Sequence, residues 1–360
     1  MVMTYYSVAA TAQWMLEGTR KYGAKGLKQA AASFNPGDLD VNMRGKVACV
    51  TGANSGIGYC VAKSLAERNC TVHMLCRNKA RGEDARNRVL LATGNEDVHL
   101  HIVDVSDFRQ QVEDFADSFL ASNPSLNVLV NNAGGMPAKR TESAQGHEAI
   151  MSTMLGGTFL LTKLLMPALE KAAVRETPGK LEGAAPGGGA RVINVSSGGM
   201  YTVSGEGIPN DLDSRRVQPY DGTVIYAMAK RAQVTLTERW AALHENISIN
   251  SMHPGWCDTP GLSAGMPDFH KAQQGTLRSS EGGSDTVVWL ACSEAAKGET
   301  GKFWFDRKAR RTHMRLASTR TSESEISALW QAAEALCSNH RAEKTLHSDC
   351  GETETLCSEL

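Results

Sequence analysis

Short apolar runs alternate with amphipathic stretches from about residue 45 to residue 306, and this alternation restricts the fold more than any other feature. Seven runs have the length and composition of buried strands. They are Val47–Val50, Thr71–Leu75, His99–Val103, Val128–Val130, Val192–Val195, Ile247–Met252 and Phe303–Phe305. Helices are expected between them, for example at residues 56–68, 78–92, 107–122 and 224–244. Because right-handed crossovers join such strands into a parallel sheet, the sequence predicts an α/β fold with a doubly wound sheet of about seven strands.

The same alternation divides the chain into one domain with two extensions. Residues 1–43 precede the domain, residues 44–306 form it, and residues 307–360 follow it. Residues 174–190 are rich in proline and glycine and are expected to form a loop, since the strand–helix alternation resumes after them. In the C-terminal extension we expect a solvated basic run from Arg307 to Arg311 and a helix at 323–337. The last 23 residues are polar and are predicted to be disordered.

The N-terminal extension carries a helical stripe of side chains. The stripe consists of Tyr5, Val8, Ala12, Met15, Thr19 and Tyr22. Lys21, Lys25 and Lys28 fall on the opposite face, with Trp14 among them. We expect this amphipathic helix to pack on the main domain. Two alternatives stay open: peripheral membrane contact through residues 1–33, and a mitochondrial transit peptide, because Glu17 is the only acidic residue before Asp38.

Charge and cysteine content limit the partners and the compartment. The chain has 38 basic and 39 acidic residues and a formal charge of -1, so no global positive field would hold a nucleic acid. The sequence contains no run of 18 or more apolar residues, so it does not predict an ordinary transmembrane helix. The 9 cysteines include no C-x-x-C pair, which fits reduced thiols and indicates neither a disulfide framework nor a metal site. We therefore expect a cytoplasmic protein, with the membrane-peripheral and mitochondrial alternatives just named.

A glycine-rich turn follows the first predicted strand. Residues 46–58 read KVACVTGANSGIG, so Gly52, Gly56 and Gly58 lie between that strand and the next helix. Glycine permits the backbone angles of such a turn and lets the main chain approach a pyrophosphate. The helix N-terminus then offers unpaired N–H groups and the positive end of its dipole to the anion. The turn predicts nucleotide binding, and hence a sheet of the Rossmann type.

Five motifs, in order along the chain, resemble those of the short-chain dehydrogenase/reductase family. They are the glycine turn at 51–58, Asn131-Asn132-Ala133-Gly134, Val195-Ser196-Ser197, the Y-x-x-x-K of Tyr226 and Lys230, and the stretch from Pro254-Gly255 to Thr259. Each motif ends a predicted strand or lies on the helix that follows. Together they cover about residues 45–306. Longer stretches, among them residues 34–39, 197–200, 237–240, 251–256 and 306–308, resemble one member of the family in particular.

The resemblance implies which residues act on the substrate and on the cofactor. A free tyrosine is a poor base near neutral pH, and a nearby ammonium stabilises its phenolate. Tyr226 and Lys230 share one helix face at a spacing of four, and Ser197 is implied to hold the substrate oxygen beside the phenol. These three residues are the implied catalytic set. The implied cofactor-binding residues are Gly52, Asn54, Ser55, Gly56, Ile57, Gly58, Arg77, Asp104, Val105, Asn131, Ala133, Gly134, Tyr226, Lys230, Pro254, Gly255 and Thr259.

The end of the second predicted strand indicates which nicotinamide cofactor is bound. A carboxylate there would recognise an adenosine 2′-hydroxyl, whereas a 2′-phosphate needs a cation. The strand ends Leu75-Cys76-Arg77-Asn78 without an acid, so we expect NADP(H) rather than NAD(H). Asp104 resembles an adenine-contacting residue, but capping of a nearby helix explains it about as well.

One residue departs from the family pattern. The family usually has an asparagine on the helix after the fourth strand, three residues before a glycine, and the alignment puts Met154 there. A thioether cannot anchor the water that relays protons to the lysine. We therefore carry two hypotheses: an NADP(H)-dependent oxidoreductase acting on a carbonyl/alcohol pair, possibly apolar or lipid-like, and a non-catalytic NADP(H)-binding sensor or scaffold. By analogy with related folds, a homodimer is also predicted.

Overall fold

An eight-stranded sheet forms the centre of the protein, for which the computed structural model describes residues 6–175, 189–315 and 319–338. The strands are β1 Val47–Thr51, β2 Thr71–Cys76, β3 Val98–Ile102, β4 Val128–Asn131, β5 Arg191–Val195, β6 Ser248–Met252, β7 Phe303–Phe305 and β8 Lys308–Arg310. Their order is β3-β2-β1-β4-β5-β6-β7-β8, and the first seven are parallel. The predicted doubly wound fold is confirmed, with one strand more than expected.

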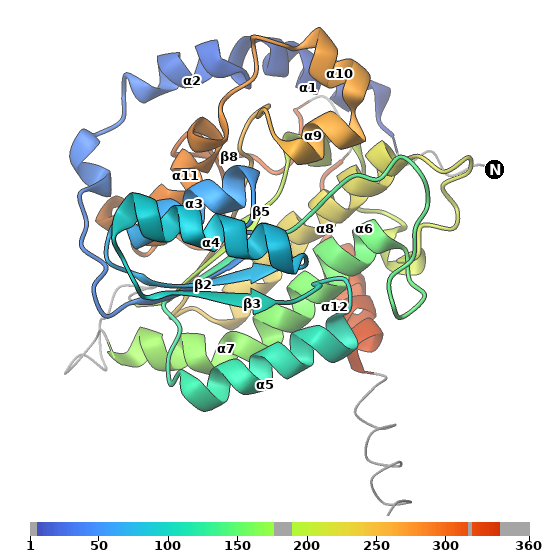
Figure 1. The fold of residues 1–360 in the computed structure, drawn as a ribbon. Helices are drawn as coiled ribbons and strands as arrows, with labels where there is room; N and C mark the ends of the chain where they lie inside the picture. Colours follow the sequence, from blue (N-terminus) through green and yellow to red (C-terminus); the bar gives the residue numbers. More distant parts are fainter. Residues whose placement is uncertain (1–5, 176–188, 316–318, 339–360) are drawn as a thin grey trace, which may run out of the picture.

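Helices cover both faces of this sheet (Figure 1). One face carries α3 Gly56–Ala66, α4 Lys79–Thr93 and α11 Ser280–Cys292, whose apolar side chains form one core cluster with the strands. The other carries α5 Glu113–Ser122, α7 Thr158–Arg175, α8 Gly222–Leu243 and α12 Glu323–Ser338, which form a second cluster. The central strands β5 and β6 are buried along their whole length, as expected for a parallel sheet that is covered on both faces, although both include polar residues.

The eighth strand corrects the expectation for the basic run after residue 306. Asp306 and Arg307 have φ values of 51° and 54° and turn the chain back, so β8 pairs antiparallel with β7. The Arg307 side chain is only 8% exposed, and its guanidinium pairs with Asp285 at 2.7 Å and with Asp38 at 3.5 Å. Arg307 is therefore part of a buried ion-pair network. The sequence pattern had indicated a solvated face, and the structure agrees with this for Lys308 and Arg311, which are exposed, but not for Arg307.

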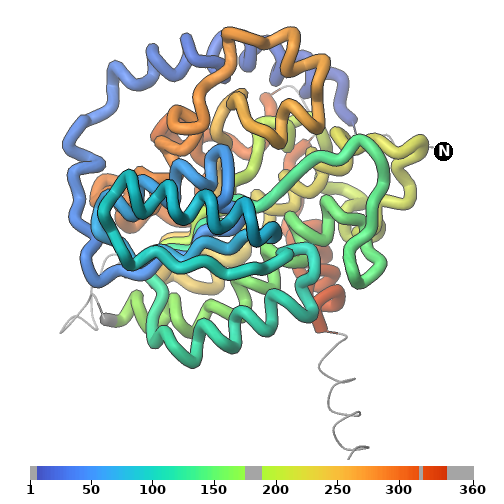
Figure 2. Tube along the Cα trace, viewed as in Figure 1, coloured from blue at the N-terminus to red at the C-terminus, as the bar shows by residue number. Residues whose placement is uncertain are grey.

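The N-terminal extension forms α1 Val8–Lys21 and α2 Ala24–Ala31, which run over the segment of α9 Pro260–Gly265 and α10 Pro267–Ala272 (Figure 2). The prediction that the stripe of Tyr5 to Tyr22 packs against the domain is wrong. Val8 is 85% exposed, and the other described members except Tyr22 are exposed too. The packed face has a step of four instead and consists of Ala10, Trp14, Gly18 and Tyr22.

Small residues explain why that face was missed. A Cβ on Gly18 would lie 2.4 Å from the ring of Trp256, so close packing requires glycine here. Glycine and alanine add little to a hydrophobic pattern, although they allow two aromatic side chains to pack deeply. Val8 and Leu16 are left exposed on the outside. Membrane contact of this helix stays a prediction, which liposome sedimentation would test.

One helix among the described residues, Ala149–Val174, is long and apolar enough to cross a membrane, although the sequence has no unbroken apolar run of that length. Its apolar window is 72% buried inside the structure. Packing against the sheet therefore accounts for its composition, as in the core helix of a globular domain.

Arg278 holds the extension against the rest of the molecule. Its guanidinium binds both carboxylate oxygens of Asp306, at 2.5 and 2.9 Å. It also donates to the main-chain carbonyls of Tyr22 and Lys21, each at 2.8 Å, and to that of Pro254 at 3.4 Å. The side chain is 1% exposed. A single buried cation thus ties together α1, the loop after β6 and the turn between β7 and β8.

Replacing Arg278 with Met is expected to lower the free energy of unfolding by roughly 3–5 kcal/mol, because Asp306 keeps its charge in a buried position without a partner. Urea denaturation followed by circular dichroism measures the change. Lys63→Met, which breaks an exposed pair with Glu67, is the control and should cost less than about 1 kcal/mol. Equal losses in the two variants would contradict a structural role for the buried pair.

Candidate functional site

A cavity of about 890 Å³ opens at the carboxyl ends of the parallel strands. Ligands bind at this edge in open α/β sheets, where the strand order reverses between β1 and β4. The cavity wall contains nearly all residues that the sequence singled out. These are Gly52, Asn54, Ser55, Gly56, Ile57, Arg77, Asp104, Val105, Ala133, Gly134, Ser197, Tyr226, Lys230, Pro254, Gly255 and Thr259.

The glycine turn has the geometry that an anion site requires. Gly52 and Gly56 have φ values of +64° and +55°, a region that disfavours residues with a Cβ. Ser55 occupies the N-cap position of α3 but its side chain makes no capping hydrogen bond. The first N–H groups of α3 therefore face the cavity end without a side-chain cap, and they fit a dinucleotide pyrophosphate.

Two predicted cofactor-binding residues, Gly58 and Asn131, do not line the cavity. A Cβ on Gly58 would lie 2.4 Å from the carbonyl oxygen of Gly52, so this glycine serves the packing of the turn. The Asn131 amide nitrogen donates inside the protein to Thr162 and Asn194, at 3.0 and 2.9 Å. Both residues therefore stabilise the cavity wall from inside the protein and do not face the cavity themselves.

Asn132, which does line the cavity, connects the end of β4 to the end of β1 by hydrogen bonds. Its side-chain amide donates to the carbonyl of Thr51 at 2.9 Å. In return, the Thr51 hydroxyl accepts from the main-chain N–H groups of Asn132 and Ala133, both at 2.9 Å. These bonds hold the N-N-A-G segment directly beside the glycine turn, which is a supporting role that the motif alone does not reveal.

Ser197, Tyr226 and Lys230 come together at the cavity wall from the end of β5 and the first half of α8. Asp221 caps α8 by accepting from the N–H groups of Thr223 and Val224. Nζ of Lys230 lies 5.5 Å from the centre of the Tyr226 ring. The neighbouring serine is accounted for: Ser196 is buried and donates to the carbonyl of Lys230 at 2.9 Å. Both serines line the cavity, but the Ser196 hydroxyl is already engaged, so Ser197 is the serine of this pair that is assigned to the substrate.

Burial shifts the titration of these groups in opposite directions. The surrounding protein removes water and raises the pKa of Tyr226 to about 12, while the side chain of Ser197 acts in the opposite direction. Burial lowers the pKa of Lys230 to about 7. Lys230 donates to the carbonyl of Val195 at 2.7 Å and to the side chain of Gln233 at 3.1 Å. A phenol next to a buried amine and a hydroxyl can exchange a proton with a bound carbonyl or alcohol.

Arg77 stands at the tip of β2, where its side chain is 77% exposed. One guanidinium nitrogen lies 3.8 Å from a carboxylate oxygen of Asp104. The other oxygen of Asp104 accepts from the main chain and hydroxyl of Ser106, at 2.9 and 2.7 Å. An exposed pair of this length holds the arginine weakly, so the guanidinium is free to turn to another anion.

The sequence did not indicate that the N-terminal extension contributes aromatic side chains to the cavity wall. Trp14 and Tyr6, both from the N-terminal extension, line it, as do Trp256 and Phe269. The Trp14 ring packs edge-on against Trp256, with the ring centres 5.9 Å apart. Residues 260–280 contain α9 and α10 beside this wall. The step-of-four pattern from Ala10 to Tyr22 was the signal that could have found Trp14.

Comparisons with known proteins agree with this architecture. The family model described as short chain dehydrogenase matches residues 46–205. Human Dehydrogenase/reductase SDR family member 12, the member that the longer stretches resemble, is 43% identical over 90% of this chain and 96% of its own. Human Retinol dehydrogenase 12 is 30% identical over 79% of this chain and 85% of its own.

Solved structures share the fold. L-sorbose reductase from Gluconobacter frateurii, in complex with NADPH and L-sorbose, has a TM-score of 0.56 at 22% identity and covers 74% of this chain and 96% of its own. An uncharacterised protein from Mycobacterium paratuberculosis reaches 0.60 at 23% identity, covering 82% of this chain and 95% of its own. With the ordered motifs around one cavity and 43% identity across most of its length, the chain belongs to the short-chain dehydrogenase/reductase family.

Proposed function

We propose that the protein is an oxidoreductase that transfers a hydride between a nicotinamide cofactor and a carbonyl/alcohol pair. The convergence of Ser197, Tyr226 and Lys230 on one cavity with the glycine turn is the observation that carries this proposal. The uncapped start of α3 and the two left-handed glycines fit the pyrophosphate of such a cofactor. When bound, the cofactor supplies or accepts the hydride.

The chain's own residues manage the proton. In reduction, the Tyr226 hydroxyl donates its proton to the oxygen of the substrate, where negative charge develops. In oxidation, the phenolate accepts the proton of the alcohol, and the nearby Lys230 ammonium stabilises this anion. The Ser197 hydroxyl donates a hydrogen bond to the same substrate oxygen and orients it toward the phenol.

Replacing Tyr226 with Phe removes the only proposed proton donor and is expected to reduce kcat by about 100-fold or more, since general acid–base catalysis contributes at least this factor. Nicotinamide absorbance with a panel of aldehydes and ketones measures it. Cofactor binding, followed by calorimetry, should persist. Undiminished turnover in Tyr226→Phe would contradict the role of the phenol. A wild-type chain that binds the cofactor but turns over none of the panel would favour the sensor or scaffold, the alternative that Met154 supports.

We further propose NADP(H) as the preferred cofactor. Arg77 ends β2, and the weak pair with Asp104 leaves its charge available to a 2′-phosphate. Among solved structures of the same fold, L-sorbose reductase is complexed with NADPH, whereas a 3-ketoacyl-(acyl-carrier-protein) reductase is complexed with NADH, so the preference rests on Arg77.

Changing Arg77 to Asp is expected to weaken NADPH binding by about 10-fold to 100-fold, because a carboxylate repels the 2′-phosphate, while NADH binding changes little or improves. Fluorescence titration of both cofactors measures the ratio of dissociation constants. Arg81→Asp, one helix turn further along, is the matched charge control. An equal loss for NADPH and NADH would overturn the cofactor preference.

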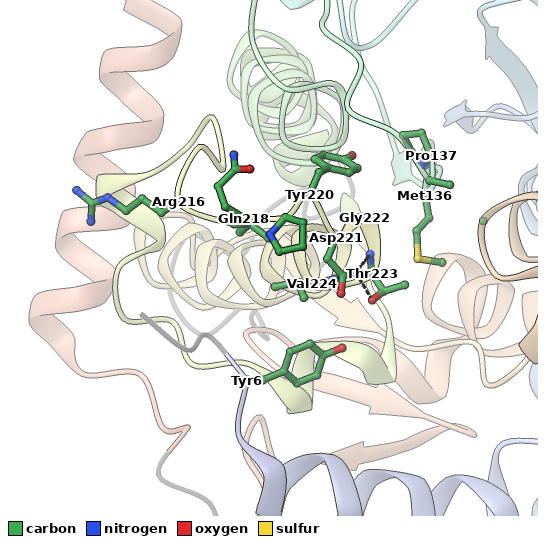
Figure 3. Close-up of a pocket in the computed structure, with 14 residues that line it drawn as sticks. Tyr6, Met136, Pro137, Arg216, Gln218, Tyr220, Asp221, Gly222, Thr223 and Val224 are labelled. Atoms are coloured by element: carbon green, nitrogen blue, oxygen red, sulfur yellow. Dashed lines mark hydrogen bonds between the residues drawn. The ribbon is translucent and has the colours of Figure 1, made fainter. Parts of the chain in front are cut away.

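The substrate is proposed to be an apolar carbonyl or alcohol. Trp14, Trp256, Phe269 and Met266 give the cavity an apolar wall. A second hollow of about 460 Å³ shares Tyr6, Met136, Pro137 and Thr223 with the main cavity, and so offers room for a long substrate. Figure 3 shows Tyr6 beside the first residues of α8 in this hollow. The names of the retinol dehydrogenase relatives also favour an apolar alcohol.

Shortening Trp14 to Ala is expected to lower kcat/KM for long-chain aldehydes about 10-fold, which corresponds to roughly 1.4 kcal/mol of lost apolar contact. For a short aldehyde such as propanal, which cannot reach this wall together with the phenol, the change should stay within about 3-fold. Met15→Ala, on the outer face of the same helix, is the control. If long and short aldehydes lost activity equally, Trp14 would not select the substrate.

A further inference from the structure

A side-chain amide connects Lys230 to the helix that carries Met154. Nζ of Lys230 donates to Oε1 of Gln233 at 3.1 Å, and Nε2 of Gln233 donates to the main-chain carbonyl of Met154 at 2.9 Å. Gln233 and Lys230 are only 2% and 3% exposed. The amide therefore uses one acceptor and one donor to bridge α8 and the helix after β4 inside the protein.

Met154 takes part in this bridge through its main chain alone. Its side chain is buried and points toward Gly134, where an added Cβ would lie 2.6 Å from the methionine methyl group. The carbonyl lies in a π-helical segment, Ser152–Gly157, and widened turns of this kind often occur at functional sites. Any residue at this position would offer the same main-chain carbonyl. The hydrogen bond from Gln233 therefore does not depend on whether position 154 is the asparagine of the family pattern or a methionine.

We propose that Gln233 is a positioning residue, whose amide bridge fixes the Lys230 ammonium beside Tyr226 as a stationary charge. The inference rests on the oxidoreductase function proposed above. An ammonium has three N–H donors. Val195 accepts one and Gln233 accepts another, which leaves one for the cavity that Lys230 lines. A carboxamide neither gains nor loses a proton in the ordinary pH range, so this bridge orients the lysine and does not relay protons.

The bridge matters because the lysine is buried. Burial favours the neutral amine and lowers the pKa of Lys230, whereas each carbonyl that accepts from Nζ stabilises the ammonium. Among the described residues, Tyr226 is the titratable group that faces the ammonium, and Cys257 acts on the phenol from beyond it. Without the Gln233 oxygen, the lysine would carry less charge at neutral pH and the phenolate would lose stabilisation.

The test replaces Gln233 with Met, which has a similar length but forms neither hydrogen bond. Two readouts are compared with wild type. The first is the titration midpoint of Lys230, followed by NMR of protein labelled with ¹³C,¹⁵N-lysine and assigned through Lys230→Arg. The second is the pH profile of kcat for alcohol oxidation. We expect the Lys230 midpoint to fall by about one pH unit, since the ammonium loses one of the two oxygen atoms to which it donates. The rising limb of kcat should move to higher pH, with a loss of about 10-fold to 100-fold.

A second substitution separates the two halves of the bridge. Gln233→Glu keeps an acceptor for Lys230 but removes the donor to Met154, so the Lys230 midpoint should stay at or above the wild-type value. The negative charge of the added carboxylate cancels part of the stabilisation that the ammonium gives to the Tyr226 phenolate. We therefore expect kcat of Gln233→Glu to stay below the wild-type value, as in Gln233→Met. Val234→Ala, equally buried on α8 but packed with Met200 and Phe303, controls for general disturbance of the helix.

A Gln233→Met variant whose Lys230 midpoint and kcat profile match those of wild type or Val234→Ala would overturn the proposal. The NMR titration needs no turnover. If the wild-type chain reduces or oxidises no substrate, the proposed function fails, while the shift of the Lys230 midpoint still decides whether Gln233 holds the charge.

Discussion

The buried ion pair of Arg278 and Asp306 is the interaction on which the arrangement around the cavity depends. Burying a guanidinium is costly unless each donor finds an acceptor, and here the acceptors come from three separate segments of the chain. The requirement to satisfy one charge therefore fixes the N-terminal helices, the loop at Pro254 and the turn after β7 relative to one another. The aromatic wall of the cavity follows from this, because Trp14 and Trp256 lie on two of those segments.

A chain of polar side chains under the sheet performs a similar task for α8. Asn131 donates to Asn194, Asn194 donates to Thr237, and the Thr237 hydroxyl donates to the carbonyl of Gln233. These bonds connect the ends of β4 and β5 with the helix that carries Tyr226 and Lys230. Hydrogen bonds between buried side chains rigidify their surroundings. The position of the proposed proton donor is thus set by buried amides as well as by apolar packing.

The sequence predicted the sheet and most of the cavity wall because both are encoded locally. Most strands are short, largely apolar runs, and each motif ends a strand or lies on the helix that follows, so topology brings the motifs to one edge. It could not predict contacts between distant segments. β8 depends on two left-handed residues after β7, and the packed face of α1 depends on Gly18 fitting against Trp256. The role of Gln233 likewise arises from a carbonyl 79 positions away, which no local pattern records.

The seating of α1 over the cavity has a consequence for how such a protein can diversify. The proposed reacting groups lie just after β5 and on α8, whereas Trp14 and Tyr6 come from a stretch that precedes the first strand. Exchange of this leading stretch, by recombination or alternative splicing, would reshape this part of the cavity wall while the proposed catalytic residues stayed unchanged. The proposed substrate selectivity and the proposed proton transfer therefore depend on separate segments of the chain.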